Sequence, residues 1–448
     1  MRGKLIGLGA GALLVAGSLV PVMGSGIARA NAPARIAAAT QPAAPHDPYA
    51  KEAKKYKGQS ITFIGDNSIG TGHDRDVQLD KRFFQDTGIK VNEIPHPNAS
   101  DASYEQLARL FNSHSSSVDV MMLDVVWPGA FAPYLVDLKP SMGKQLKNSL
   151  SSIVSNDTIN GHTVGAPWFG DYGILYYRTD LLKKYGYKSP PTTWAQLTAM
   201  SKKVMAGERK KDKNFWGFVF QGNAYEGLTC DSLEWIASSG GGTFFSGHKD
   251  TVNNPKAIAA MNMARSWVGT ISPPGVTSYM EEDARNIFDG GHALFMRNWP
   301  YAYSASQTTP VKGKFDVTVL PHGPGGHSVG TVGGWQLGVS KFSKHQGAAI
   351  EFVKYLTSTA VERYDAINDS NVPVIPSVLH DPAVVKTNPY LKPAIANVPR
   401  VTRPSRFLGP HYLAGSQAIF QAMNRILNGS DASSVLPALQ QQLQRITP

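Results

Sequence analysis

The first third of the chain alternates between short apolar runs and segments with helical apolar spacing. Residues 60–64 read Ser-Ile-Thr-Phe-Ile, a β-branched and aromatic run typical of a strand. Residues 77–85 carry apolar side chains at helical spacing, and Thr87-Gly88 ends that segment. The pattern predicts strands at 60–64, 89–91 and 118–123, and helices at 77–85 and 104–111. Strands that alternate with helices predict a parallel sheet with crossover helices, and so an α/β fold.

A second alternation begins after residue 167. It predicts strands at 173–178, 215–220 and 290–296, and helices at 193–205, 228–238 and 257–268. Thr193 and Gln196 have the spacing of a capping box at the start of one helix. Residues 315–320, 336–340 and 348–357 predict two strands and a helix that return to the first sheet, and 413–427 and 435–446 predict two terminal helices.

The length of 448 residues is too great for one hydrophobic core, so two lobes are expected. We assign an N-terminal lobe to residues 58–166 and 316–368. The C-terminal lobe takes residues 167–315 and 369–448. Ligands of parallel sheets bind beyond the carboxyl ends of the strands, where Asp66, Asn67 and Asp124 stand.

The first 57 residues differ from the rest in composition. Arg2 and Lys4 precede an apolar stretch broken by glycines, and Ala28-Arg29-Ala30 offers a cleavage site, which predicts a signal peptide over residues 1–30. The competing interpretation is an uncleaved membrane anchor. Residues 31–57 are rich in Ala and Pro at their start and are expected to form a disordered leader. No cysteine follows the signal segment for a lipid anchor, so we expect a periplasmic protein.

Charge and cysteine content narrow the function classes. The formal charge is +11, and it becomes +8 when Arg2, Lys4 and Arg29 are removed with the signal peptide. No block of Lys and Arg is interleaved with aromatics, so nucleic acid is not an expected partner. The single cysteine, Cys230, cannot form an intramolecular disulfide and is expected to be a small buried hydrophobe. No cofactor is expected.

Six segments combine aromatic, acidic or basic residues in a way that fits a sugar-binding cleft. An aromatic ring can stack on the apolar face of a sugar, and charged groups can hold its hydroxyls. A Trp buried in the core is the competing interpretation for any one of them. The segments are residues 122–128, 167–171, 225–230, 297–301, 333–336 and 403–406.

Two other classes remain open on these residues. A glycoside hydrolase needs two carboxylates around the scissile bond, which Asp124, Asp171 and Glu226 could supply. A receptor for a non-sugar solute such as ferric iron could use Tyr176 and Tyr177. On a strand those two side chains would point to opposite faces, which favours core packing. The twelve histidines are scattered, so no metal site is expected.

Several long runs give the chain a resemblance to a known family. They are residues 124–133, 168–180, 215–235, 267–275, 279–285, 295–303 and 333–338. With these runs the chain, from about Ile61 to its end, resembles the family 1 extracellular solute-binding proteins of ABC importers, closest to the trehalose/maltose-binding proteins. The resemblance implies a two-lobe periplasmic-binding-protein fold of type II, joined by several hinge crossings, that closes on an α-linked glucose disaccharide without chemistry of its own. It also implies a monomer that delivers the sugar to ABC permease subunits.

The resemblance further implies a set of ligand-binding residues. Trp299 and Trp335 would stack on sugar rings, with Tyr301 nearby and backbone contacts at Gly334. Asp124, Asp171, Glu226, Asn298 and Arg403 (rather than Arg406) would hold hydroxyls. His73 stands where relatives can carry an acid, and Ala102-Ser103 follows Asp101 where relatives can carry an arginine. We expect both departures to affect one sugar subsite.

Overall fold

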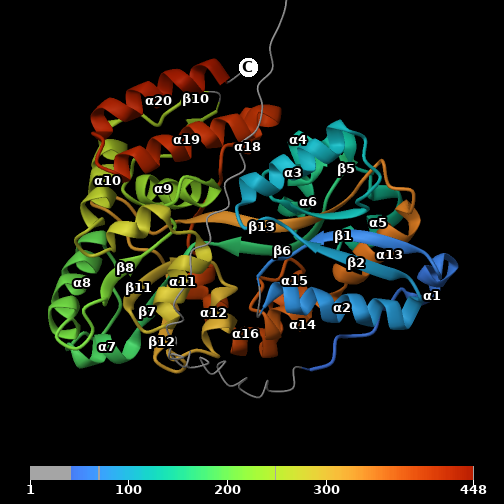
Figure 1. The fold of residues 1–448 in the computed structure, drawn as a ribbon, viewed down its shortest axis with the longest axis horizontal. Coiled ribbons are helices and arrows are strands. Elements are labelled where there is room, and N and C mark those ends of the chain that lie inside the picture. Colours follow the sequence, from blue (N-terminus) through green and yellow to red (C-terminus); the bar gives the residue numbers. More distant parts are fainter. Residues whose placement is uncertain (1–41, 69–70, 248, 447–448) are drawn as a thin grey trace, which may run out of the picture. The chain divides into compact units, whose positions relative to one another are not determined.

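The computed structural model describes residues 42–68, 71–247 and 249–446 (Figure 1). The predicted signal peptide and the first part of the predicted leader lie outside these residues. The leader prediction is wrong for its last part, because α1 (Ala50–Ala53) and the 3-10 turn η1 (Lys54–Tyr56) form there. Hydrogen bonds from residues far away in the sequence hold the start of this segment in place. Arg82 Nε donates to the carbonyl of Ala44 at 3.0 Å, and Tyr355 Oη donates to the carbonyl of Pro45 at 2.9 Å. A four-residue helix is too short to produce a periodic signal.

The first sheet contains the predicted parallel core. Its strands β1 (Ser60–Gly65), β2 (Lys90–Pro95) and β3 (Val120–Asp124) lie in the order β2-β1-β3, with β1 parallel to both neighbours. Helices α2 (Gly72–Thr87) and α3 (Ser100–Asn112) make the crossovers. Asp66 and Asp124 therefore stand at the same edge of the sheet, as the sequence predicts.

Two long strands connect this sheet to the rest of the protein. Strand β13 (Gly330–Val339) pairs antiparallel with β3 and with β6 (Ala166–Tyr172), and β14 (Arg400–Val401) pairs with its first residues. The sequence pattern does not predict a strand at β6, because its Ala-Pro-Trp-Phe-Gly-Asp-Tyr run has no alternation and contains Pro and Gly. Figure 1 shows β6 and β13 between the two groups of helices.

The second sheet has four strands, in the order β12 (Phe315–Thr318), β7 (Ile174–Arg178), β11 (Ala293–Asn298) and β8 (Trp216–Val219). The predicted return to the first lobe at residue 316 is wrong, because β12 pairs antiparallel with β7. Phe315 and Val317 pack there beside Tyr176. A short apolar strand carries no information about which sheet it joins, so only the tertiary pairing places the boundary.

The larger helices agree with the sequence pattern. They are α8 (Trp194–Glu208), α9 (Glu226–Ser238), α10 (Pro255–Trp267), α13 (Gln346–Leu356), α19 (Tyr412–Leu427) and α20 (Ala432–Ile446). The capping box of α8 is formed, since Gln196 N donates to Thr193 Oγ1 at 3.2 Å. Two further helices, α11 (Glu281–Asp289) and α14 (Thr359–Asn368), are absent from the sequence prediction.

The remaining elements are short. They are α4 (Pro128–Phe131), η2 (Ala132–Tyr134), α5 (Lys139–Leu146), α6 (Ser151–Asn156), β4 (Thr158–Ile159), β5 (His162–Thr163), α7 (Thr179–Lys184), β9 (Phe245–Ser246), β10 (Lys249–Asp250), η3 (Pro274–Ser278), α12 (Ala302–Ser306), α15 (Pro376–Leu379), α16 (Pro382–Thr387), η4 (Pro389–Leu391), α17 (Pro393–Ala396), α18 (Ser405–Leu408) and η5 (Gly409–His411). In the described part of the chain, every helix is too short or too polar to cross a membrane.

Candidate functional site

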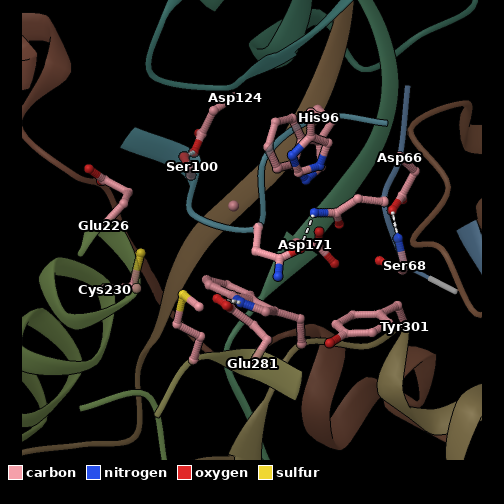
Figure 2. A pocket seen from close by; sticks show the side chains of 18 of the residues that line it. Asp66, Ser68, His96, Ser100, Asp124, Asp171, Glu226, Cys230, Glu281 and Tyr301 are labelled. Atoms are coloured by element: carbon pink, nitrogen blue, oxygen red, sulfur yellow. Dashed lines mark hydrogen bonds between the residues drawn. The ribbon is translucent and has the colours of Figure 1, made fainter. Parts of the chain in front are cut away.

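A cavity of about 1110 Å³, its open mouth included, lies where the carboxyl ends of β1 and β3 meet the start of α9 and the end of β11. Figure 2 shows Asp124 and Glu226 on the left of this cavity and Asp66 and Tyr301 on the right, with Asp171 between them. The predicted site residues that line it are Asp124, Asp171, Glu226, Trp299, Tyr301, Gly334, Trp335 and Arg403. Elements far apart in the sequence thus bring most of the predicted residues together.

Arg403 pairs with two carboxylates that line the cavity. Its Nη1 donates to Asp124 Oδ2 and to Glu226 Oε1, both at 2.9 Å, and its Nη2 donates to Asp124 Oδ1 at 2.5 Å. Asp124 ends β3 of the first sheet, whereas Glu226 begins α9, whose Asp231 and Glu234 pair with Arg297 of β11 in the second sheet. All three side chains are buried. A bridge of this kind persists only while the two lobes remain together.

Further donors complete the coordination of Glu226. Ser416 Oγ donates to Glu226 Oε2 at 2.7 Å, and Tyr412 Oη donates to Glu226 Oε1. Burial raises the pKa of Glu226 against the opposing effect of Arg403. Because its oxygens are already occupied by protein donors, Glu226 acts in this arrangement mainly as an anchor for Arg403.

Two half-buried tryptophans offer ring surface to the cavity. Trp335 on β13 lies edge-on to Trp127, with ring centroids 5.9 Å apart, and near His96, at 5.3 Å. Trp299 follows β11, and its Nε1 donates to Glu281 Oε1 at 3.2 Å. By contrast, Trp127 and Trp168 in the predicted segments are buried in the core. The core interpretation therefore holds for Trp127 and Trp168, whereas Trp299 and Trp335 line the cavity.

Asp171 is the carboxylate without a protein partner. It lies on β6, lines the cavity, and accepts no side-chain hydrogen bond from the described residues. Burial, together with the carboxylates of Asp66 and Asp124, raises the pKa of Asp171 well above its ordinary value. A half-buried carboxylate that lacks donors is free to accept them from a ligand.

Asp66 lines the same cavity, but Arg75 already balances its negative charge. Its Oδ2 lies 3.8 Å from Arg75 Nη2, and its Oδ1 accepts from Ser68 N at 2.8 Å. Burial raises the pKa of Asp66, but Arg75 and His96 outweigh it, so the net shift is downward. The strand-end position of Asp66 points to this cavity, although the predicted ligand-binding set omits the residue.

Two predicted ligand residues lie outside the cavity lining. Asn298 is fully buried; its Nδ2 donates to the carbonyl of Glu281 at 3.2 Å and its Oδ1 accepts from Trp299 N at 2.8 Å. It supports Trp299 because alternation along β11 directs its side chain into the protein. His73 is the second residue of α2, and its Nδ1 lies 3.0 Å from Oε1 of Glu93 on β2. The sequence predicts a ligand contact for His73, but in the structure its side chain pairs with Glu93 and does not line the cavity.

The structure adds two residues that sequence reasoning missed, Glu281 and His96, which line the cavity. Tyr225, from the predicted segment 225–230, also lines it, and its Oη donates to Glu281 Oε2 at 2.7 Å. Glu281 stands in one of the runs that carry the family resemblance, which is the signal available for it. Cys230 is buried as predicted and also reaches the cavity.

The metal interpretations have no geometric support in the described residues. There, no group of three or more His, Cys, Asp or Glu side chains is arranged to hold a metal ion. Tyr176 is fully buried, and its Oη donates to the carbonyl of Trp299 at 2.8 Å. It supports the Trp299 turn from within the core.

Known proteins are similar to this chain in sequence. The family model of bacterial extracellular solute-binding proteins matches residues 74–363. A probable ABC transporter-binding protein of Deinococcus radiodurans is 42% identical over 395 residues, which cover 86% of this chain and 93% of that protein.

Solved structures share the architecture. Maltose-bound MalE3 of T. maritima superposes with a TM-score of 0.81 at 36% identity, covering 87% of this chain and 100% of that chain. A solute-binding protein of an ABC transporter from Agrobacterium radiobacter K84, in complex with ribitol, has a TM-score of 0.75 at 22% identity, covering 87% and 99%. The latter likeness concerns the fold.

Proposed function

The chain belongs to the bacterial extracellular solute-binding proteins, and on that premise we propose that it is the sugar receptor of an ABC importer, with an α-linked glucose disaccharide of the trehalose or maltose type as ligand. It is a binding protein and not an enzyme. The observation that carries the proposal is one cavity lined by two tryptophan rings, an arginine and an unpartnered carboxylate.

The disaccharide class follows from the combination of groups. Trp299 and Trp335 come from different elements and can each accept the apolar face of one glucose ring. The maltose in the T. maritima relative, which is 36% identical to this chain, supports the same class of ligand.

The polar groups divide into two roles in this proposal. Asp171 accepts hydrogen bonds from sugar hydroxyls directly, because no protein donor competes for it. Arg403 and Asp124 present the remaining edges of their mutual ion pair to the ligand. Arg403 Nε is buried and has no hydrogen-bond partner among the described residues.

We propose three further steps for this receptor: export, closure on the sugar and docking on the permease. The protein is exported by a signal peptide cleaved near Ala30 and works in the periplasm as a monomer. The lobes close on the sugar, since its contacts come from both. The closed form then docks on the permease of an importer, where the sugar is released.

A thermal-shift screen tests the proposal. Trehalose and maltose should raise the unfolding temperature of the wild-type protein, because a ligand that binds only the folded form stabilises it. Sucrose, glucose and larger glucans serve as comparison ligands. Overnight incubation should leave the disaccharide intact. Stabilisation by none of these sugars, or cleavage of the disaccharide, would contradict the proposal.

A further inference from the structure

Trp299 is supported from behind by a cation that does not itself line the cavity. The guanidinium carbon of Arg297 lies 3.9 Å from the centre of the Trp299 ring. Arg297 is 1% exposed. Since Trp299 lines the cavity and Arg297 does not, the guanidinium covers one ring face and leaves the other for a ligand.

Arg297 is itself held in a fixed orientation. Its Nε and Nη2 donate to the two oxygens of Glu234 at 2.9 and 2.6 Å, and its Nη1 donates to Gln221 Oε1 at 3.1 Å. Asp231 Oδ1 lies 3.0 Å from Arg297 Nε. A planar guanidinium with this many fixed partners cannot rotate without breaking several charge-assisted bonds.

The edge of the indole is also fixed. Trp299 Nε1 donates to Glu281 Oε1, and Glu281 is held in turn by Tyr225 Oη. Gly333 lies close to the ring: a methyl group at that position would stand 3.1 Å from Trp299 Cζ3. Face, edge and flank of the ring therefore each have a contact that resists tilting.

We propose that Arg297 is a positioning residue for sugar binding, which holds the Trp299 ring at the tilt required for stacking. The inference rests on the proposed function, since it concerns the same ligand. It differs from a purely structural role because its effect on affinity passes through one ring. A stacked ring must be parallel to the sugar face, and ordering a ring that is free to tilt weakens binding.

Arg297→Lys is the informative change. The lysine keeps the positive charge beside Asp231 and Glu234, so the fold is retained, but it lacks the flat surface that stacks on the indole. We expect about tenfold weaker binding of maltose or trehalose by calorimetry, the scale of a desolvated cation–π contact. Arg209→Lys is the matched control. The guanidinium carbon of Arg209 lies 4.2 Å from the centre of the Trp216 ring, and neither residue lines the cavity. This variant should bind as the wild type does.

A double-mutant cycle separates positioning from an independent effect. In a Trp299→Ala background, Arg297→Lys should cause no further loss of sugar affinity. Fluorotryptophan-labelled protein supplies a spectroscopic signature: the Trp299 resonance should shift and broaden in Arg297→Lys, while the Trp267 resonance stays unchanged. If Arg297→Lys does not fold, the charge-free variant with Arg297→Met, Asp231→Asn and Glu234→Gln takes its place with the same expectations.

The outcomes are distinguishable. Unchanged affinity in Arg297→Lys, while Trp299→Ala binds weakly, would overturn the positioning role and leave the proposed function standing. Equal losses in the presence and absence of the Trp299 ring would also overturn it. Failure of the wild type to bind any of the sugars would overturn the proposed function and this inference with it.

Discussion

Arg403 and Arg297 are both buried arginines that bind two carboxylates, yet the elements that carry those carboxylates differ. Asp231 and Glu234, the acidic partners of Arg297, both lie on one helix, α9. Asp124 and Glu226, the partners of Arg403, belong to β3 of the first sheet and to α9. The same chemistry therefore stabilises the fold in one place and depends on the approach of the lobes in the other.

The largest expected effect is a difference in the free energy of unfolding between variants of the two arginines. Arg297→Met should lower the free energy of unfolding by about 3–5 kcal/mol, because it leaves two carboxylates buried without a cation. Arg403→Met should cost less, about 1–3 kcal/mol, because parting of the lobes lets water reach Asp124. Urea denaturation without sugar measures both. Equal costs, or a larger cost at Arg403, would break the comparison.

The next effect concerns the two rings. Trp299→Ala and Trp335→Ala should each weaken disaccharide binding by about 2 kcal/mol or more while the protein stays folded. Calorimetric titration measures the loss, with Trp216→Ala as a control because Trp216 lies outside the cavity. Wild-type affinity in both cavity variants would assign these rings to structural packing.

A smaller effect should appear as a pH dependence of binding at Asp171. The pKa of Asp171 is raised in the free protein, and hydroxyl donors from a sugar favour its charged form and lower that pKa in the complex. Binding then releases a proton, so affinity should rise with pH between the pKa of the complex and that of the free protein, and fall on acidification.

Asp171→Asn should bind more weakly and lose that pH dependence, while Asp316→Asn, outside the cavity, should keep both properties of the wild type. Calorimetry in buffers with different ionisation enthalpies counts the protons released. Proton uptake on binding, or the same pH dependence in Asp171→Asn, would contradict this role.

The smallest expected effect is at His73. Because its ring pairs with Glu93 and lies outside the cavity lining, His73→Ala should change sugar affinity by less than about 0.5 kcal/mol. The ranking of trehalose and maltose should also be unchanged. A changed ranking would restore the expectation from sequence that His73 selects the sugar.

Strong periodicity makes the first sheet and the long helices predictable. Strands β1 and β3 are short apolar runs in an alternating strand–helix pattern, and that pattern alone is enough to bring Asp66 and Asp124 to one edge of the sheet. Strand β6 and the boundary at β12 are not predictable, because Pro167 and Gly170 hide one strand and the other joins its sheet through tertiary pairing alone.

The cavity-lining residues can be predicted from the sequence only as far as residue type and the family resemblance identify them. Residue type and resemblance identify the two rings, Asp171 and Arg403. They cannot separate Trp299 from the adjacent Asn298, whose side chain turns inward. They also cannot show that Arg403 holds Asp124 and Glu226 together, since that contact joins residues 279 and 177 positions apart. Such geometry depends on how the lobes meet.

The central claim is that two lobes close on a disaccharide held between them. Small-angle scattering of the wild-type protein, with and without saturating maltose or trehalose, tests it most directly. We expect a smaller radius of gyration with sugar, because the Asp124–Arg403–Glu226 bridge and the two rings are brought together only in the closed form. Identical scattering curves with and without a sugar whose binding calorimetry has confirmed would contradict it.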